Sequence, residues 1–196
     1  SQTTLDGEEI YKVNPFDWER EFSEIIQGGG FDVVIGNPPY VRSVRLREAD
    51  LEAWAYYSGI YESARVGEYD IYLCFAEHGF RLLRKDGRLG MILPNKWFTT
   101  QVGAGLRRLL AESQAVDHVV DFGHFQVFPN VTTYTCLLFL RSIACDTVTV
   151  NLLDTAPMAV TPSPGRSGRW QHVTIASSEL GDSMWNLAAG TPRVVL

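Results

Sequence analysis

The sequence predicts an α/β fold built around a parallel sheet. An apolar, β-branched run at residues 31–36 stops at a rigid polar turn, and a second apolar run at residues 88–93 stops at Pro94-Asn95. Between these runs, residues 70–83 repeat apolar side chains at helical spacing. An order of strand, helix and strand is typical of parallel α/β packing, so the two runs are expected to be neighbouring strands.

The later part of the chain extends this alternation. Residues 102–112 predict a second helix, and residues 116–122 predict a third strand. Residues 132–141 and 146–153 are rich in β-branched and aromatic side chains, which favours two further strands. Because a loop without a helix joins these two late strands, we expect them to pair antiparallel at one edge of the sheet.

The segments around the first strand are less regular. Residues 14–26 predict a short amphipathic helix, with Asn14 as its cap and Pro15 at the first helical position. Gly28-Gly29-Gly30 follows and lacks the Gly-x-Gly-x-x-Gly spacing between a strand and a helix, so it predicts a linker rather than a phosphate loop. Residues 41–67 predict a partly helical excursion, whose aromatic side chains either pack or contact bases.

Composition limits the class of protein. A chain of 196 residues with 45% hydrophobic content suits one domain with a sizeable core. No apolar stretch is long enough to cross a bilayer, and the polar, acidic amino terminus is unlike a signal peptide. Cys74, Cys136 and Cys145 are scattered, which favours a reducing compartment over a disulfide framework or a zinc site. We therefore expect a cytoplasmic protein.

Charge is unevenly distributed behind the net value of −6. Residues 1–30 carry seven acids against two bases, whereas residues 81–108 carry seven bases against one acid. Arg42, Arg45 and Arg47 lie just after the polar turn. These bases either contact nucleic-acid phosphates or form a solvated face, and the sequence does not separate the two. The four histidines show no metal-ligand spacing, so no metal site is expected.

The polar turn Asn37-Pro38-Pro39-Tyr40 is the most informative stretch of the chain. It directly follows the first predicted strand, and in open α/β sheets ligands bind at the carboxyl ends of strands. The Asn37 amide and a backbone fixed by two prolines offer hydrogen-bond acceptors, and Tyr40 adds an aromatic plate. This chemistry suits the amino group of a flat ring. The alternative is an ordinary stiff turn.

A family resemblance follows from four stretches in order. They are residues 31–40, Tyr69-Asp70-Ile71-Tyr72, residues 86–97 and Val127-Phe128-Pro129-Asn130-Val131. Together they resemble the carboxyl-terminal half of the catalytic domain of adenine-specific (N6) DNA methyltransferases, in particular bacterial type IIG restriction–modification and phage-exclusion enzymes. Residues 14–150 carry this resemblance. Residues 172–187 resemble the entry segment of a target-recognition domain.

The resemblance implies a fold and a mechanism. The fold is the second half of the Rossmann-like sheet of class I S-adenosylmethionine-dependent methyltransferases, with an antiparallel edge hairpin. An adenine is flipped out of double-stranded DNA into a pocket. The Asn37 side-chain oxygen and the Pro38 carbonyl accept the two hydrogens of its amino group, while Pro38 and Pro39 fix the backbone. Tyr40 stacks on the flipped ring, and S-adenosylmethionine is the methyl donor.

The same resemblance implies further site residues. Phe128 closes the base pocket from another side, with a buried loop anchor as its alternative role. Lys96 is a candidate for the pocket wall or a phosphate contact, and Asp70 for the edge of the pocket or of the cofactor site. The arginines that follow the turn, Arg42, Arg45 and Arg47, are candidates for DNA phosphate contacts.

One departure from the family concerns the cofactor. The family binds it with a glycine-containing loop and an acid upstream of the catalytic turn, and the 36 residues before Asn37 contain neither.

We therefore predict that residues 1–154 are the carboxyl-terminal part of the catalytic domain, and that residues 155–196 are a linker and a truncated recognition segment. Alone, the chain is expected to be inactive, to bind cofactor poorly and to self-associate through an exposed sheet edge.

Two other functions stay open at this point. The first is a non-catalytic module that keeps the methyltransferase shape for DNA binding or assembly. The second is a protein-glutamine methyltransferase acting on release factors, which shares the Asn-Pro-Pro-Tyr motif. The stretch around Phe128 and the recognition-like segment favour the DNA enzyme over the glutamine methyltransferase, and the non-catalytic module stays open.

Overall fold

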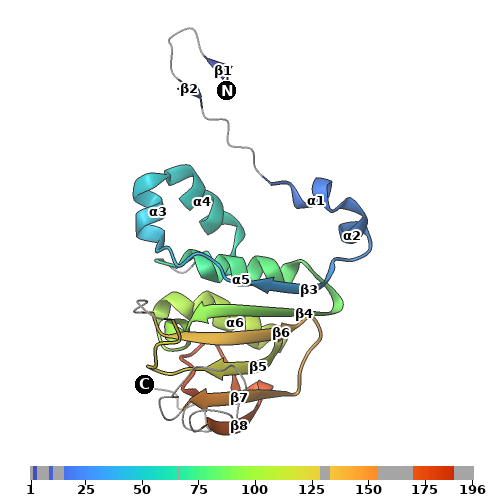
Figure 1. Cartoon of the computed structure of the whole chain (residues 1–196), viewed down its shortest axis with the longest axis vertical. Coiled ribbons are helices and arrows are strands. Elements are labelled where there is room, and N and C mark those ends of the chain that lie inside the picture. Colours follow the sequence, from blue (N-terminus) through green and yellow to red (C-terminus); the bar gives the residue numbers. More distant parts are fainter. Residues whose placement is uncertain are drawn as a thin grey trace.

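The main feature of the molecule is a six-stranded mixed sheet with the strand order β3-β4-β6-β5-β7-β8 (Figure 1). The computed structural model describes residues 2–3, 9–10, 16–65, 67–128, 133–153 and 170–187. The strands of the sheet are β3 (Phe31–Gly36), β4 (Leu83–Pro94), β5 (Val116–Asp121), β6 (Thr135–Arg141), β7 (Thr147–Leu153) and β8 (Trp170–Ala176). Two short strands, β1 (Gln2–Thr3) and β2 (Glu9–Ile10), form a separate antiparallel pair.

Strand pairing confirms the predicted α/β class. β3 and β4 are parallel, with Gly36 beside Met91, and α5 (Ile71–Arg81) connects them. β6 is antiparallel to both of its neighbours, β4 and β5. β7 is parallel to β5 and antiparallel to β8. All five strands predicted from the sequence are present, together with α5 and α6 (Ala104–Ser113).

The antiparallel hairpin at the edge is built from different strands than the sequence predicts. Residues 132–141 do not pair with residues 146–153, so that prediction is wrong. β6 instead lies inside the sheet, and the edge pair is β7 with β8. Because no helix separates β5 from β6, the chain turns back directly beside β5 and fills the position between β5 and β4.

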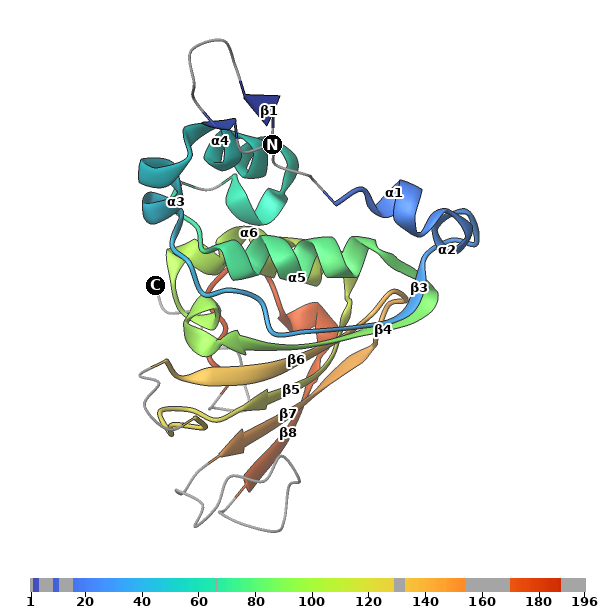
Figure 2. The ribbon, with the colours of Figure 1, turned by 45° about the horizontal axis from the view of Figure 1, so that its top comes forward.

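The two main helices cover one face of the sheet (Figure 2). Their apolar side chains form one core with the strands, including Leu73 from α5, Leu110 from α6 and Leu138 from β6. Gly79 lets α5 approach closely, because a Cβ there would lie 2.8 Å from side-chain atoms of Leu89 and Met91. This packing fixes α5, and with it the start of α5, against β4.

β3 forms one edge of the sheet and is only half covered. Val34 packs against the core, but the side chains of Val33 and Ile35 are 55% and 84% exposed. Although an apolar, β-branched run is typical of a buried strand, β3 is therefore partly exposed within the described residues. Within them, β3 pairs with β4 alone.

The segment before β3 holds two short helices, α1 (Trp18–Glu21) and α2 (Ser23–Gln27), in place of one predicted helix. The side chain of Asp17 caps α1, whereas Asn14 and Pro15 lie outside the described residues. The Trp18 ring packs edge-on against Phe31, with 5.9 Å between ring centroids. This contact holds α1 against the start of β3.

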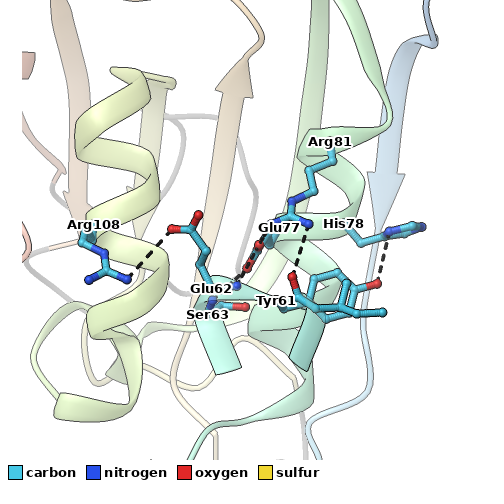
Figure 3. Close-up of polar contacts among 8 residues, drawn as sticks. Tyr61, Glu62, Ser63, Glu77, His78, Arg81 and Arg108 are labelled. Atoms are coloured by element: carbon cyan, nitrogen blue, oxygen red, sulfur yellow. Dashed lines mark hydrogen bonds and ion pairs between the residues drawn. The ribbon is translucent and has the colours of Figure 1, made fainter. Parts of the chain in front are cut away.

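The predicted excursion after the turn is helical, as expected. It contains α3 (Ser43–Ala49), α4 (Leu51–Ile60) and the 3-10 turn η1 (Glu62–Ala64). Glu77 of α5 anchors it: this fully buried carboxylate accepts hydrogen bonds from the backbone nitrogens of Glu62 at 3.0 Å and Ser63 at 2.8 Å, and it pairs with Arg81 (Figure 3). Tyr61 packs in a small cluster with Tyr69, so these aromatics have a packing role.

Residues 170–187 belong to the same core as the sheet. Besides β8, they contribute Trp185, which is 2% exposed and packs edge-on against Trp97 with 5.2 Å between centroids. The indole nitrogen of Trp185 donates to the Gly181 carbonyl at 2.7 Å. The predicted linker at residues 155–169 lies outside the described residues. The assignment of residues 172–187 to target recognition stays a prediction.

Two further findings concern the described residues alone. None of their helices is long and apolar enough to cross a membrane. In the same part of the chain, no three His, Cys, Asp or Glu side chains come close enough together to hold a metal ion. Cys74, Cys136 and Cys145 are buried free thiols.

Candidate active site

A cavity of about 360 Å³ opens where β3 and β4 end. Its walls come from the turn after β3, the end of β4, the start of α5 and the start of β6. Because β6 runs antiparallel, its first residues lie at the same edge as the last residues of β4. The lining residues are Tyr40, Arg42, Asp70, Tyr72, Pro94, Asn95, Lys96, Thr133 and Tyr134.

The polar turn presents its acceptor beside this cavity. Asn37 is exposed and Pro38 is buried, so the turn is fixed by its first proline while the amide stays accessible. The Tyr40 hydroxyl donates to Asn37 Oδ1 at 3.3 Å and lies 3.4 Å from the Ile92 carbonyl oxygen. Burial raises the pKa of Tyr40, with a further contribution from Cys136, so its hydroxyl is a donor at neutral pH.

Two candidates from the sequence, Asp70 and Lys96, form an ion pair in the cavity wall. Lys96 Nζ lies 2.6 Å from Asp70 Oδ2. The Asp70 side chain is 5% exposed and that of Lys96 is 48% exposed, so the ammonium group neutralises a buried carboxylate while still reaching solvent. The pair therefore ties the start of α5 to the loop after β4.

The three arginines after the turn have different surroundings. Arg42 lines the cavity, forms an isolated antiparallel bridge with Asp70 and pairs with Glu68 at 3.4 Å. Arg47 lies over the Trp54 ring, 5.2 Å from its centroid. Arg45 is exposed. The structure thus brings Arg42 to the cavity and leaves the other two on the neighbouring surface.

A hydrogen-bond network holds the loops at the carboxyl ends of β4 and β5 together. Asn95 Nδ2 donates to Asp121 Oδ1 and to the Gly123 carbonyl, both at 2.8 Å. The Gly123 backbone nitrogen donates to the same carboxylate oxygen at 2.9 Å. Burial raises the pKa of Asp121, although both hydrogen bonds act in the opposite direction. Asn95, which lines the cavity, is therefore held in place by hydrogen bonds to the end of β5 and the loop after it.

Sequence reasoning missed several cavity residues. Tyr72 lies in a stretch singled out as a motif, but its helical spacing assigned it to the core. Asn95 was noted only as the end of a strand, and Tyr134 as part of a β-rich run. A signal existed for Tyr72, because it is a polar aromatic residue two positions after Asp70 at a helix start.

Phe128 does not line the cavity. Its side chain is 41% exposed, so the alternative role as a buried anchor does not describe it either. Tyr134, which is 46% exposed, is the aromatic side chain that the described residues place in the wall on the β6 side. The role of Phe128 in closing a base pocket stays a prediction, because residues 129–132 lie outside the described part of the chain.

The fold and the site together define a protein of the class I methyltransferase fold, with an acceptor turn beside a cavity at the sheet's carboxyl edge. The chain belongs to the Eco57I restriction-modification methylase family, whose model matches residues 2–128. The resemblance to restriction–modification methyltransferases carried by the four stretches is thereby confirmed.

Similar proteins agree with this membership. The type II restriction enzyme and methyltransferase RM.Eco57I of Escherichia coli is 37% identical over 134 residues, which are 68% of this chain and 12% of that protein. The type II methyltransferase M.BstVI of Geobacillus stearothermophilus is 30% identical over 127 residues, 64% of this chain and 21% of that protein. The chain therefore spans between 12% and 21% of the length of these two relatives.

A solved structure supports the fold. The type IIG restriction endonuclease BpuSI superimposes with a TM-score of 0.56, covering 79% of this chain and 20% of that one. The sequence identity is 14%, so this likeness concerns the fold alone.

The described residues do not fit the cofactor loop of the class. Glycines after a strand and before a helix occur at the start of α6, where Gly103 and Gly105 lie. A Cβ on Gly103 would come within 2.0 Å of the Trp97 carbonyl oxygen, and one on Gly105 within 2.3 Å of the Glu62 carbonyl oxygen. Protein backbone therefore fills the space that a cofactor would need at these glycines.

Proposed function

We propose that residues 1–196 hold the target base in a site-specific DNA adenine-N6 methyltransferase, as part of a longer polypeptide that serves restriction–modification or phage defence. The hydrogen bond from the Tyr40 hydroxyl to Asn37 Oδ1 carries this proposal. In the proposed complex, the amino group of the target base donates to this same Asn37 oxygen. The bond lies beside the cavity at the end of β3. Family membership and the names of the relatives support methyl transfer to DNA as the reaction.

The turn performs the main part of the proposed mechanism. A flipped adenine enters the cavity, and one hydrogen of its amino group replaces the Tyr40 hydroxyl at Asn37 Oδ1. The Pro38 carbonyl accepts the second hydrogen. The two bonds orient the nitrogen lone pair, and the fixed acceptors stabilise the positive charge that develops on the nitrogen. Pro38 and Pro39 hold the backbone, so little reorganisation is needed.

The other site residues have supporting roles in this proposal. Tyr40 stacks on the flipped ring once its hydroxyl is released. Lys96 and Arg42 are the proposed contacts of a DNA phosphate at the cavity mouth, although each already pairs with a carboxylate, Asp70 and Glu68 respectively. The assignment of Phe128 to the pocket and of Arg45 and Arg47 to phosphates rests on the family resemblance.

S-adenosylmethionine is the proposed methyl donor, because the chain belongs to a methylase family and the resemblance implies this cofactor. It would supply an electrophilic methyl group on a sulfonium. Since Gly103 and Gly105 are packed against backbone, we propose that residues outside 1–196 hold it. Residues 1–196 alone are then expected to be inactive and to show no micromolar binding of the cofactor in calorimetry.

Tritium transfer from labelled S-adenosylmethionine to DNA by the longer polypeptide tests the proposal. Asn37→Ala should lower kcat by about 10²–10³, the usual cost of one lost charge-stabilising hydrogen bond. Gln27→Ala, which removes an exposed amide at the end of α2, should leave transfer unchanged. Undiminished transfer by Asn37→Ala would contradict the mechanism. Label in protein instead of DNA would favour the glutamine methyltransferase, and no transfer would favour a non-catalytic module.

A further inference from the structure

Tyr72 is an unusual residue in the floor of the cavity. It is one of the lining residues, yet its side chain is 0% exposed. Its hydroxyl is buried and has no hydrogen-bond partner within the part of the chain that the structure describes. Buried hydroxyls normally have a partner, because leaving one unsatisfied is costly. Among the described residues the group is therefore free to bond a ligand in the cavity.

The fold holds Tyr72 firmly in this place. It lies in the first turn of α5, two residues after Asp70, whose carboxylate is fixed by Lys96. Its ring stands edge-to-face against that of Tyr40, with 6.0 Å between centroids and 78° between planes. A residue of the acceptor turn is thus in contact with the ring that carries the buried hydroxyl.

The hydroxyl of Tyr72 can act only as a neutral group. Burial raises its pKa far above the ordinary value, and the neighbouring Asp70, Cys136 and Tyr40 act in the same direction. The phenol therefore keeps its proton at any pH at which the protein works. It offers one O–H donor in the same cavity that Tyr40 lines, and the Tyr40 hydroxyl bonds the acceptor Asn37 Oδ1.

An acceptor and a neutral donor at one cavity match a particular ligand edge. On adenine, the exocyclic amino group is a donor, and the ring nitrogens N1 and N7 on either side of it are acceptors. Asn37 takes the amino group in the function proposed above, which leaves a ring nitrogen for a donor close by. We propose that Tyr72 is a specificity-determining residue, whose hydroxyl donates a hydrogen bond to N1 or N7 of the flipped adenine. This inference rests on the proposed function.

Deaza-substituted DNA tests this contact. The longer polypeptide is assayed for methyl transfer to duplexes that carry adenine, 1-deazaadenine or 7-deazaadenine at the target position. The wild type should discriminate against one of the two analogues by about tenfold in kcat/KM, because that base lacks the acceptor. Tyr72→Phe should lose this discrimination and transfer at similar rates to adenine and to that analogue.

A matched control is Tyr69→Phe. Tyr69 is equally buried, but its hydroxyl donates to the Trp54 carbonyl at 3.1 Å and not into the cavity. This variant should lose stability while it keeps the wild-type discrimination. Tyr72→Phe should melt within about 2 °C of the wild type, because it removes a hydroxyl without a partner.

The outcomes separate the two proposals. Transfer by the wild type with equal kcat/KM for all three bases would overturn the role of Tyr72 alone, and so would unchanged discrimination by Tyr72→Phe. If Tyr72→Phe fails to fold, the role of Tyr72 is also overturned, because the hydroxyl then has a structural partner. Absence of transfer to adenine by the wild type would overturn the proposed function, and this role with it.

Discussion

At the scale of single residues, Tyr40 competes with the proposed substrate for Asn37. Its hydroxyl donates to Asn37 Oδ1 at 3.3 Å and faces the Ile92 carbonyl oxygen at 3.4 Å. Both contacts are long for hydrogen bonds between oxygens, so they are weak ones. A substrate amino group can therefore displace the hydroxyl at little cost and still find the ring beside it.

Two substitutions of Tyr40 separate its ring from its hydroxyl. Tyr40→Phe keeps the ring and frees Asn37, so kcat/KM for methyl transfer should stay within about threefold of the wild type or rise. Tyr40→Ala removes a stacking partner worth about 1–3 kcal/mol and should lower kcat/KM by about 5- to 150-fold. Initial rates of transfer measure both. An equal loss in the two variants would show that the hydroxyl, and not the ring, matters.

For single residues, the chemistry of a short stretch such as the acceptor turn could be predicted from the sequence. Contacts between residues far apart in the sequence could not. The acceptor turn is a local pattern, and Asn37 and Tyr40 are in contact as expected. Lys96 and Asp70 were individual candidates, but their pairing depends on how α5 packs on β4. The place of Tyr134 depends on the insertion of β6 between β4 and β5, which no local pattern encodes. The place of Tyr72 in the cavity could not be predicted either, because helical spacing alone does not distinguish a core residue from a residue that lines a cavity.

At the scale of elements, Glu77 connects α5 to the excursion after the turn. Glu77→Ala leaves the backbone nitrogens of buried Ser63 and part-buried Glu62 without their acceptor, so we expect a loss of about 2–4 kcal/mol in the free energy of unfolding. Glu77→Gln keeps one acceptor and should lose less. Urea denaturation of residues 1–196 measures the difference. Glu112→Ala, an exposed glutamate on α6, is the control, and equal stability of Glu77→Ala and this control would contradict the role.

A second element-scale prediction concerns the side of the sheet formed by β5, β7 and β8. Asn151 Nδ2 donates to His118 Nε2 at 2.8 Å, so that nitrogen must be unprotonated, and Asn151 Oδ1 lies 2.6 Å from His172 Nδ1. Burial lowers the pKa of His118. Asp117 acts in the opposite direction and His172 in the same direction, and the pKa is lowered overall. The unfolded chain therefore binds more protons below the ordinary histidine pKa of about 6.5, and acid should destabilise the fold.

The melting temperature of residues 1–196 should thus be lower at pH 5.5 than at pH 7.5. His78, whose pKa is also lowered by burial, contributes with the same sign. His118→Gln can still accept from Asn151 but does not titrate, so this variant should show a smaller drop between the two pH values. A drop as large as that of the wild type would exclude His118 as a source of the pH dependence.

Elements were predictable where hydrophobic periodicity decides them. α5 and α6 lie where their spacing predicts, and β4 is longer than expected because it begins at Leu83. Strand order was not predictable in the same way. A strand that follows a short loop can pair on either side of the strand before it. β6 takes its place because a position is open between β5 and β4.

At the scale of the whole molecule, the edge at β3 is the main exposed feature. β3 pairs on one side only within the described residues, and Ile35 presents 84% of its side chain there. Unprotected edges template pairing with other chains. The sequence predicts this self-association because the family resemblance implies an upstream strand that residues 1–30 do not contain. The degree of exposure of Ile35 follows only from the three-dimensional arrangement.

Residues 1–196 by themselves should therefore form a dimer that depends on concentration. Ile35→Lys, which puts a charge on the exposed face of the edge strand, should shift the chain toward monomer. Sedimentation velocity over a hundredfold range of concentration measures the change. Lys85→Ala is an exposed control at the start of β4. A wild-type chain that stays monomeric throughout would contradict the role of the edge.

The central claim is that the cavity beside Asn37 takes the amino group of adenine in DNA. The most direct test is mass spectrometry of the nucleosides from duplex DNA treated with the longer polypeptide and S-adenosylmethionine. We predict N6-methyladenine in the product from the wild type, and about 10²–10³ times less of it with Asn37→Ala in the same short reaction time. Methylation of cytosine in place of adenine, or N6-methyladenine at the same yield with Asn37→Ala, would contradict the account.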